Sequence, residues 1–351
     1  MTPKERIIAA MKFEPVDRLP FWPKLFGVYE TRWGRPETYF HDLIGSDRVA
    51  WLFGASFSET RKHTAYSELR DGDNTECRYE TDHGTLRMRL RYGHPVEHPV
   101  KTKQDIEIMA CWFRDAEVTF DPARLEASTR RYAEFGQKAF IIDDMGESSL
   151  MRFIEYLAGI EQGHYLIHDY PGEVEDLFDA MHRNLLRRFE ISAEHSPADS
   201  LHLTENTSTT LISPEQYDRF CFPQISAYGH IAKRAGRMLM LHMCGHLKKL
   251  LPRLSQLPAT SFEAFTTPPV GNTTLRDGRE GCPDKCLVGG TNAALWMQPA
   301  ETIIAALEEQ LAQLPHHRGL FLSSAGVMPP ACSPETLHTV KRWIDAYTPR
   351  A

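Results

Sequence analysis

Short apolar runs recur through the last two-thirds of the chain, and an amphipathic segment follows each of them. Residues 139–142, 201–203 and 238–241 are three such runs. Runs of this length predict buried strands, and the amphipathic segments between them predict helices. Strands that alternate with helices are typical of a parallel sheet. About five or six such units without a GxGxxG sequence favour a (β/α)8 TIM barrel over a doubly wound sheet.

A different pattern precedes this region. Residues 77–90 alternate between polar and apolar positions within a segment of about 75–92, and Asp82-His83-Gly84 interrupts them near the middle. Alternation around a turn sequence predicts a β-hairpin, which we interpret as an insertion into the barrel. No linker rich in proline or glycine divides the chain, so we expect a single domain over residues 1–351.

Polar or reactive residues follow most of the predicted strands. Closure of a barrel brings the carboxyl ends of all its strands to one face, where the active sites of such barrels lie. We therefore expect one mouth to contain Asp143, Asp144, Glu205, His242, Cys244, Glu263 and Ser324.

The segment His242-Met243-Cys244-Gly245-His246 carries the most specific chemistry. It follows the run at 238–241, and residues two apart on a strand point to the same side. The imidazole of His242 and the thiol of Cys244 would therefore converge at the end of the strand. Nitrogen and sulfur ligands suit zinc better than calcium or magnesium, which prefer oxygen. Glu263 ends the next predicted strand and could add an oxygen, giving three protein ligands and an open position.

Composition limits the class of protein. The chain has 351 residues, of which 42% are hydrophobic and 25% charged, as in an ordinary globular protein. A net charge of -7 argues against non-specific binding to nucleic acid. We expect neither a membrane span nor a secretory signal, because no apolar run is long enough. Seven scattered cysteines, an odd number, are typical of a reducing cytoplasm.

The chain resembles the uroporphyrinogen decarboxylase superfamily and, within it, the zinc-dependent methylcobamide:thiol methyltransferases of the coenzyme M type. The similarity begins at Lys4-Glu5-Arg6-Ile7 and Pro15-Val16-Asp17-Arg18, and includes Ser213-Pro214-Glu215, Leu241-His242-Met243-Cys244-Gly245 and Ser333-Pro334-Glu335. The resemblance implies a TIM barrel. It also implies that His242 and Cys244 bind zinc, and that Glu263 occupies the open position until a thiol displaces it.

The chain departs from this branch at one place. The resemblance leads us to look for a further cysteine shortly before the last helix, but the sequence there is Ala325-Gly326-Val327. Cys332 follows six residues after Gly326 and could replace that ligand only if the loop folds differently. A carboxylate donates less electron density to zinc than a thiolate does, so zinc with one thiolate and one carboxylate would be a stronger Lewis acid than zinc with two thiolates.

Two acidic residues are candidates for a catalytic role. Glu205 could orient His242, as carboxylates commonly do for metal-bound histidines, or it could cap the turn at 207–210. Asp144 could act as a general acid or base, or backbone NH groups could satisfy the pair Asp143-Asp144. The residues alone leave these alternatives open.

Three functions are compatible with the sequence. The first is a methyltransferase that moves a methyl group between a small methylated substrate or thiol and a corrinoid. Since the chain lacks an Asp-x-His-x-x-Gly motif, the corrinoid would arrive on a partner. The second is a decarboxylase-type lyase. Residues 19–22 predict a short first strand, and the loop after it has Lys24 and no arginine before Arg32, which suits a polyanionic substrate poorly. The third is a non-catalytic binding barrel. The resemblance is also compatible with a homodimer.

Overall fold

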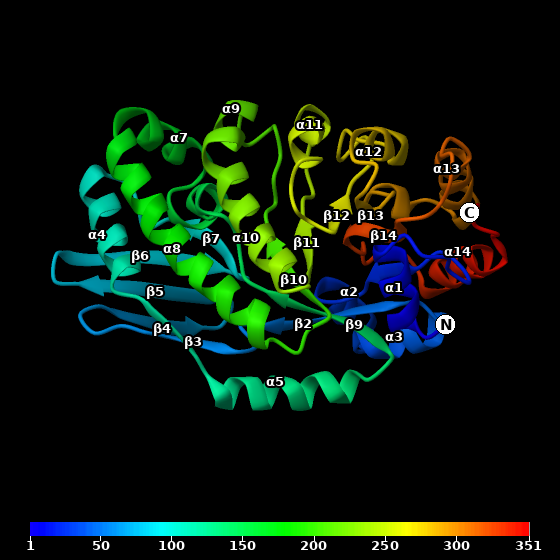
Figure 1. The fold of residues 1–351 in the computed structure, drawn as a ribbon, viewed down its shortest axis with the longest axis horizontal. Helices are drawn as coiled ribbons and strands as arrows, with labels where there is room; N and C mark the ends of the chain where they lie inside the picture. Colours follow the sequence, from blue (N-terminus) through cyan, green and yellow to red (C-terminus); the bar gives the residue numbers. More distant parts are fainter. Residues whose placement is uncertain (351) are drawn as a thin grey trace.

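The computed structural model describes residues 1–350, and eight parallel strands in it form the predicted barrel (Figure 1). The strand order is β1-β14-β13-β12-β11-β10-β9-β2, and every neighbouring pair is parallel. The strands are β1 (Phe21–Lys24), β2 (Arg48–Phe53), β9 (Ala139–Asp144), β10 (Ser200–Thr204), β11 (Met238–His242), β12 (Ser261–Phe265), β13 (Cys286–Gly289) and β14 (Leu320–Val327).

Helices connect the strands and cover the outside of the sheet (Figure 1). Those on the N-terminal side are α1 (Pro3–Met11), α2 (Val28–Trp33), α3 (Glu37–Ile44), α4 (Lys103–Arg114) and α5 (Pro122–Phe135). The middle of the chain forms α6 (Ser149–Arg152), the π-helical segment η1 (Phe153–Leu157), α7 (Ile160–Asp169), α8 (Pro171–His195), α9 (Pro214–Gln216), the π-helical segment η2 (Tyr217–Cys221) and α10 (Phe222–Arg234). The last part forms η3 (Lys248–Leu250), α11 (Leu251–Leu254), α12 (Leu275–Gly281), η4 (Leu295–Met297), α13 (Ala300–Ala312) and α14 (Pro334–Ala346).

The predicted hairpin is confirmed, but it belongs to a larger insertion between β2 and β9. Strands β5 (Asn74–Thr81) and β6 (Gly84–Arg91) pair in antiparallel fashion around Asp82 and His83. They form a four-stranded sheet with β4 (Ala65–Asp71) and β7 (His94–Glu97), and β3 (Phe57–Thr60) pairs separately with β8 (Glu117–Phe120). The insertion includes α4 and α5, so the segment from β2 to β9 holds much more structure than one hairpin.

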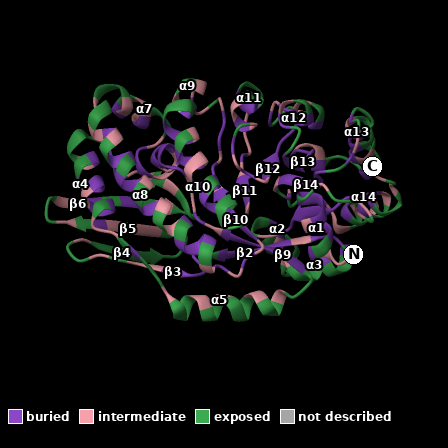
Figure 2. Ribbon diagram, viewed as in Figure 1, coloured by how far each residue is buried: buried purple, intermediate pink, exposed green. Residues whose placement is uncertain are grey.

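Apolar side chains fill the barrel interior, and α1 closes its amino-terminal end. Ile7 and Met11 of α1 pack with Val49, Phe140 and Met240, which point inward from three strands. Figure 2 shows the barrel strands as mostly buried. Because this end is filled, a small molecule can reach the barrel axis only from the carboxyl ends of the strands.

The barrel closes between β1 and β2, the two ends of the strand order. The backbone NH of Asp47 donates to the carbonyl of Phe21 at 2.8 Å, and its carboxylate accepts from the NH of Phe21 at 2.9 Å. The same buried carboxylate lies 2.6 Å from guanidinium nitrogens of Arg6 and Arg18. One aspartate therefore joins the first helix and first strand to the start of β2.

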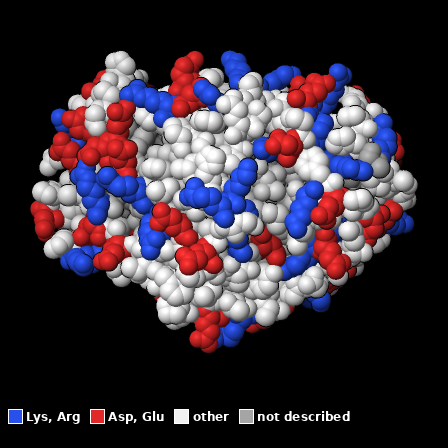
Figure 3. Space-filling view, in the orientation of Figure 1, with Lys and Arg blue, Asp and Glu red and all other residues white. Residues whose placement is uncertain are grey.

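Acidic and basic side chains are interspersed over the face of the molecule drawn in Figure 3. Among the described residues, no helix is long and apolar enough to cross a membrane.

We expect Asp47→Asn to lower the free energy of unfolding by about 3 kcal/mol, because it leaves the buried guanidinium of Arg6 and the half-buried one of Arg18 without their shared counter-charge. Urea denaturation measures the change. Glu190→Gln is the matched control, since Glu190 pairs with Arg187 at 2.9 Å on the exposed surface, and the effect there should stay below about 1 kcal/mol. Equal unfolding midpoints for the two variants would show that the closure of the barrel between β1 and β2 does not depend on this carboxylate.

Candidate active site at the carboxyl ends of the barrel strands

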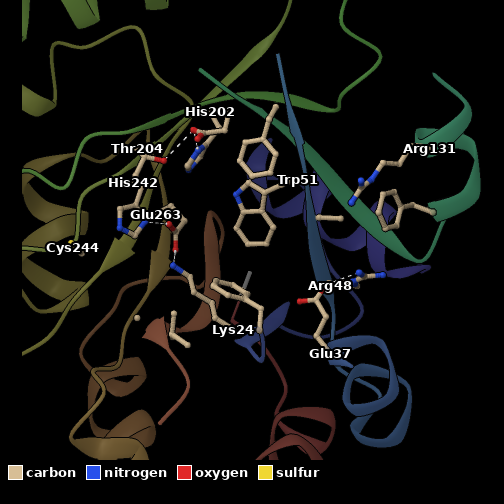
Figure 4. A pocket seen from close by; sticks show the side chains of 17 residues that line it. Lys24, Glu37, Arg48, Trp51, Arg131, His202, Thr204, His242, Cys244 and Glu263 are labelled. Carbon is tan, nitrogen blue, oxygen red and sulfur yellow. Dashed lines mark hydrogen bonds and ion pairs between the residues drawn. The ribbon is translucent and has the colours of Figure 1, made fainter. Parts of the chain in front are cut away.

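A cavity of about 650 Å³ lies at the open end of the barrel (Figure 4). This volume suits a small-molecule ligand. Its walls come from β1, β2, β9, β10, β11 and β12, from the end of β14 and from α5. The lining residues are Lys24, Phe26, Glu37, Arg48, Ala50, Trp51, Phe53, Arg131, Phe135, Asp144, His202, Thr204, His242, Cys244, Glu263, Gly326 and Val327.

The two-residue repeat of the strands explains why these side chains face the cavity. Met240 fills the barrel interior, His242 lies two residues later at the cavity wall, and Cys244 two residues after that. In β9, Ile142 lies in the same interior cluster and Asp144 lies at the cavity. Successive inward positions thus change from apolar to polar where each strand reaches the mouth.

His242, Glu263 and Lys24 form a chain of buried charged and polar groups. His242 lies opposite Glu263 in the pairing of β11 with β12, and its Nδ1 contacts the Oε2 atom of Glu263. The Oε1 atom of Glu263 lies 2.6 Å from the Nζ atom of Lys24, which β1 supplies. Both side chains of this ion pair are at most 5% exposed. The predicted neighbours His242 and Glu263 therefore do meet, and Lys24 joins them.

The surroundings determine the charges of the His242 and Glu263 side chains. Burial alone would raise the pKa of Glu263, but the ammonium of Lys24 and the contact with His242 lower it to about 2. Burial lowers the pKa of His242, and the nearby positive charge of Lys24 adds to this effect. At neutral pH the site therefore contains an ionised carboxylate and a neutral imidazole, which is the form of histidine that binds metals.

Cys244 lies on the same wall but has a different partner. Its thiol donates to Oδ1 of Asn206 at 3.5 Å, and Nδ2 of Asn206 donates to the carboxylate of Glu155 at 3.1 Å. Burial raises the pKa of Cys244 and raises that of Glu155 to about 7. Asn206 has a φ of 47°, in the left-handed region that strains most residues. Asparagine adopts this conformation more readily than most residues, so the better indication of a functional site is the π-helical segment that contains Glu155, since such segments recur at functional sites.

The donor types offered by His242, Cys244 and Glu263 are nitrogen, sulfur and oxygen, which fit zinc. Their arrangement is not that of a preformed site, since residues 1–350 contain no group of three or more histidine, cysteine or acidic side chains placed to hold an ion. Glu263 is engaged by His242 and Lys24, and the thiol of Cys244 is turned to Asn206. The structure thus brings two of the three predicted ligands into contact and leaves the third beside them.

Cys332 does not take part in this wall, which corrects its place among the predicted ligands. It is buried in the loop before α14, where its thiol lies 3.9 Å from the carbonyl oxygen of Ser333, and burial raises its pKa to about 12. Gly326, where the resemblance led us to look for a cysteine, lines the cavity instead. A Cβ atom added to Gly326 would meet no atom within 4 Å, so the position has room for a side chain.

Asp144 faces the cavity and forms a pair that the sequence analysis missed. Its Oδ1 atom accepts from Nδ1 of His202 at 2.7 Å and from the hydroxyl of Thr204 at 3.0 Å. His202 is buried yet lines the cavity, and its ring centroid lies 6.4 Å from that of His242. The alternation of polar and apolar residues in 201–204 was the signal that could have placed His202 at the mouth.

Asp143 and Glu205 belong to the opposite set of strand positions and point away from the cavity. Oδ1 of Asp143 accepts from the NH of Ala55 at 3.1 Å. The carboxylate of Glu205 accepts from the NH and hydroxyl of Ser148 at 2.5 and 2.8 Å. The side chain of Glu205 therefore neither contacts His242 nor caps the turn at 207–210, contrary to both expectations. Burial raises its pKa to about 8.

The raised pKa of Glu205 gives a prediction for stability against pH. Between pH about 4.5 and about 8 the unfolded chain loses this proton while the folded chain keeps it, so the contribution to stability falls as pH rises. Glu205→Gln cannot ionise. We expect it to gain more than about 1 kcal/mol relative to the unmodified protein on going from pH 5 to pH 8. Urea denaturation at both pH values measures this, and a constant difference would contradict it. Glu190→Gln on the surface serves as the control.

Comparisons with known proteins agree with this description. No curated protein gives a significant match. A solved structure of a methyltransferase from Methanosarcina mazei is similar, with a TM-score of 0.63, 15% sequence identity and coverage of 99% of each chain, which shows a shared fold. The model of the family described as uroporphyrinogen decarboxylase (URO-D) matches residues 152–347, more than half of the chain and including β10–β14 with His242, Cys244 and Glu263. The chain therefore belongs to the uroporphyrinogen decarboxylase family.

Proposed function

We propose that this protein is a methyltransferase that moves a methyl group between a small methylated molecule, or a thiol, and a corrinoid carried by a partner protein. The observation that carries the proposal is the wall formed by His242, Cys244 and Glu263 on adjoining strands at the cavity. The fold shared with a protein named as a methyltransferase supports the same reading.

The proposed cofactor is zinc. His242 and Cys244 would hold it, with Glu263 as the third protein ligand, and the bound ion would supply Lewis acidity toward the heteroatom that carries or receives the methyl group. For this to occur, the contacts of the Cys244 thiol with Asn206 and of Glu263 with Lys24 must rearrange or be shared.

The residues of the chain supply the surroundings that methyl transfer needs. The His202–Asp144 pair lies at the same cavity, and its position suits the delivery of a proton to a leaving oxygen or sulfur. The aromatic walls formed by Phe26, Trp51 and Phe135 limit the access of water. Lys24 stabilises the ionised Glu263 without being exposed itself.

Decarboxylation of a tetrapyrrole fits the cavity less well. Such a substrate carries several carboxylates and needs several free cations at its binding site. Here Lys24 pairs with Glu263 at 2.6 Å, and Arg48 pairs with Glu37 at 2.6 Å, so two of the three lining cations are already neutralised.

We expect the purified protein to contain about one zinc ion per chain, and we expect His242→Ala and Cys244→Ala each to lose most of it, since removal of a ligand weakens such sites strongly. Elemental analysis after dialysis measures the stoichiometry. Cys332→Ser is the matched control, because this thiol is buried outside the cavity. Zinc-free protein with full activity would refute the proposed role of zinc in the reaction.

Methyl transfer itself is tested spectroscopically. The protein mixed with methylcobalamin and a small thiol should convert the methylated corrinoid to the demethylated form, because the methyl group passes to sulfur as the carbon–cobalt bond breaks. The absorbance change reports the reaction. His202→Ala should slow it by about 100-fold or more, because in this direction the His202–Asp144 pair would accept the proton that the thiol releases as its sulfur takes the methyl group. No change with any thiol or methylated donor would refute the proposed reaction.

Gly326→Cys offers a test of the ligand set. The position has open space for a side chain at the cavity wall, so we expect a second thiolate to raise the affinity for zinc by at least about 10-fold. Competition with a chromophoric chelator measures the affinity. Gly326→Ser controls for the added volume, and equal affinities of the two variants would place residue 326 outside the zinc site.

A further inference from the structure

The two edges of the four-stranded sheet in the insertion are built differently. At one edge, β7 is four residues long, contains Pro95 and pairs with β6 through an irregular register. At the other edge, β4 is seven residues long, has no proline, and pairs with β5 without interruption from Ala65 to Asp71. Short length, proline and bulges are features that keep a sheet edge from pairing with another chain. Strand β7 has these features, and β4 lacks all three.

Strand β4 is open to a second chain along its whole length. All seven of its residues are exposed, and within residues 1–350 it pairs with no strand except β5. Figure 1 shows it along the outer margin of the sheet, at the left of the view. An edge strand leaves a row of backbone NH and CO groups without a strand partner. Leu69, near the middle of β4, is 68% exposed, so the edge also offers an apolar contact.

The charges on β4 favour pairing with an identical strand. Glu68 and Arg70 flank Leu69, and residues two apart on a strand point to the same face. If two copies pair in antiparallel fashion around Leu69, each Glu68 lies opposite the Arg70 of the other copy, and the two leucines lie opposite each other. Opposite charges that face each other across strands stabilise the pairing. A pairing centred on Glu68 or on Arg70 would instead place like charges opposite each other, so the charges select Leu69 as the centre.

The present contacts of these two charges leave them available. Glu68 accepts a hydrogen bond from the hydroxyl of Tyr66 at 2.6 Å and lies 3.3 Å from the guanidinium of Arg70. The side chain of Arg70 is 79% exposed, and an exposed ion pair of this kind contributes little to stability. Arg70 can therefore turn to the carboxylate of a second copy at little cost.

We propose that two copies of this protein associate through β4, in an antiparallel pairing centred on Leu69 that joins their insertion sheets into one continuous sheet. The two-fold axis of the dimer is perpendicular to that sheet. No residue of β4 lines the active-site cavity, so this association does not rest on the proposed methyl transfer.

Sedimentation velocity with charge-reversed variants tests the pairing. The unmodified protein should form a dimer as its concentration rises. Glu68→Arg and Arg70→Glu each place like charges opposite each other at two points, so we expect each to weaken dimerisation by at least about 10-fold. An equimolar mixture of the two variants should dimerise within about 3-fold of the unmodified protein, because each chain then supplies the charges that the other lacks.

Glu107→Arg is the matched control. Glu107 is exposed on α4 and lies outside β4, so the same reversal of charge should leave dimerisation unchanged. A protein that stays monomeric at every concentration would overturn the proposal. A dimer that persists in both single variants would also overturn it, as would a mixture that stays monomeric.

Cross-linking provides a second measurement that keeps both charges. Directly opposite residues on antiparallel strands have Cβ atoms about 5 Å apart, close to the separation that a disulfide needs. Leu69→Cys should therefore form an interchain disulfide in oxidised glutathione, whereas Ser67→Cys, which lies opposite Asp71 of the second copy, should not. Non-reducing electrophoresis measures the yield, with the unmodified protein as the control. Equal yields for the two variants, including none for both, would overturn the pairing around Leu69.

Discussion

A single buried carboxylate, that of Asp47, holds the barrel closed. The eight strands form a continuous parallel ladder except between β1 and β2, where two hydrogen bonds link Asp47 to Phe21. Two guanidinium groups offset the cost of burying the charge. The cavity depends on this seam, because β1 carries Lys24 and β2 carries Trp51. A shift of one strand against the other would separate the ion pair with Glu263 and move the aromatic wall.

The alternation of inward and outward side chains along each strand explains which parts of the site the sequence could predict. The strands from β9 onward, and the convergence of His242 and Glu263, follow from local alternation and from the adjacency of consecutive strands in a barrel. The choice between Asp143 and Asp144, and the outward direction of Glu205, depend on the parity of each strand. The apolar residues earlier in each strand show which of the two alternating sets of positions faces the barrel interior. The sequence analysis did not extend this pattern to residue 202, and it therefore missed His202.

Other features depend on contacts that no local pattern contains. Lys24 and Glu263 are separated by most of the chain and by two intervening strands in the sheet, so their ion pair requires the closed barrel. The insertion between β2 and β9 was recognised only at β5 and β6, where the turn sequence is strong. Helix α5 gave little signal because none of its residues is buried. The burial of Cys332 likewise depends on how the loop before α14 packs.

Lys24 also bears on the chemistry of the proposed metal site. The ammonium neutralises Glu263, so of the three proposed ligands only the thiolate of Cys244 would bring an uncompensated negative charge. A zinc ion bound there would retain more positive charge than one held by two thiolates, and it would polarise an oxygen or sulfur lone pair more strongly. Gly326 acts in the same direction, since it keeps a second thiolate away from this wall. Both features favour activation of a poor leaving group, such as the oxygen of a methyl ether, over activation of an already nucleophilic thiol.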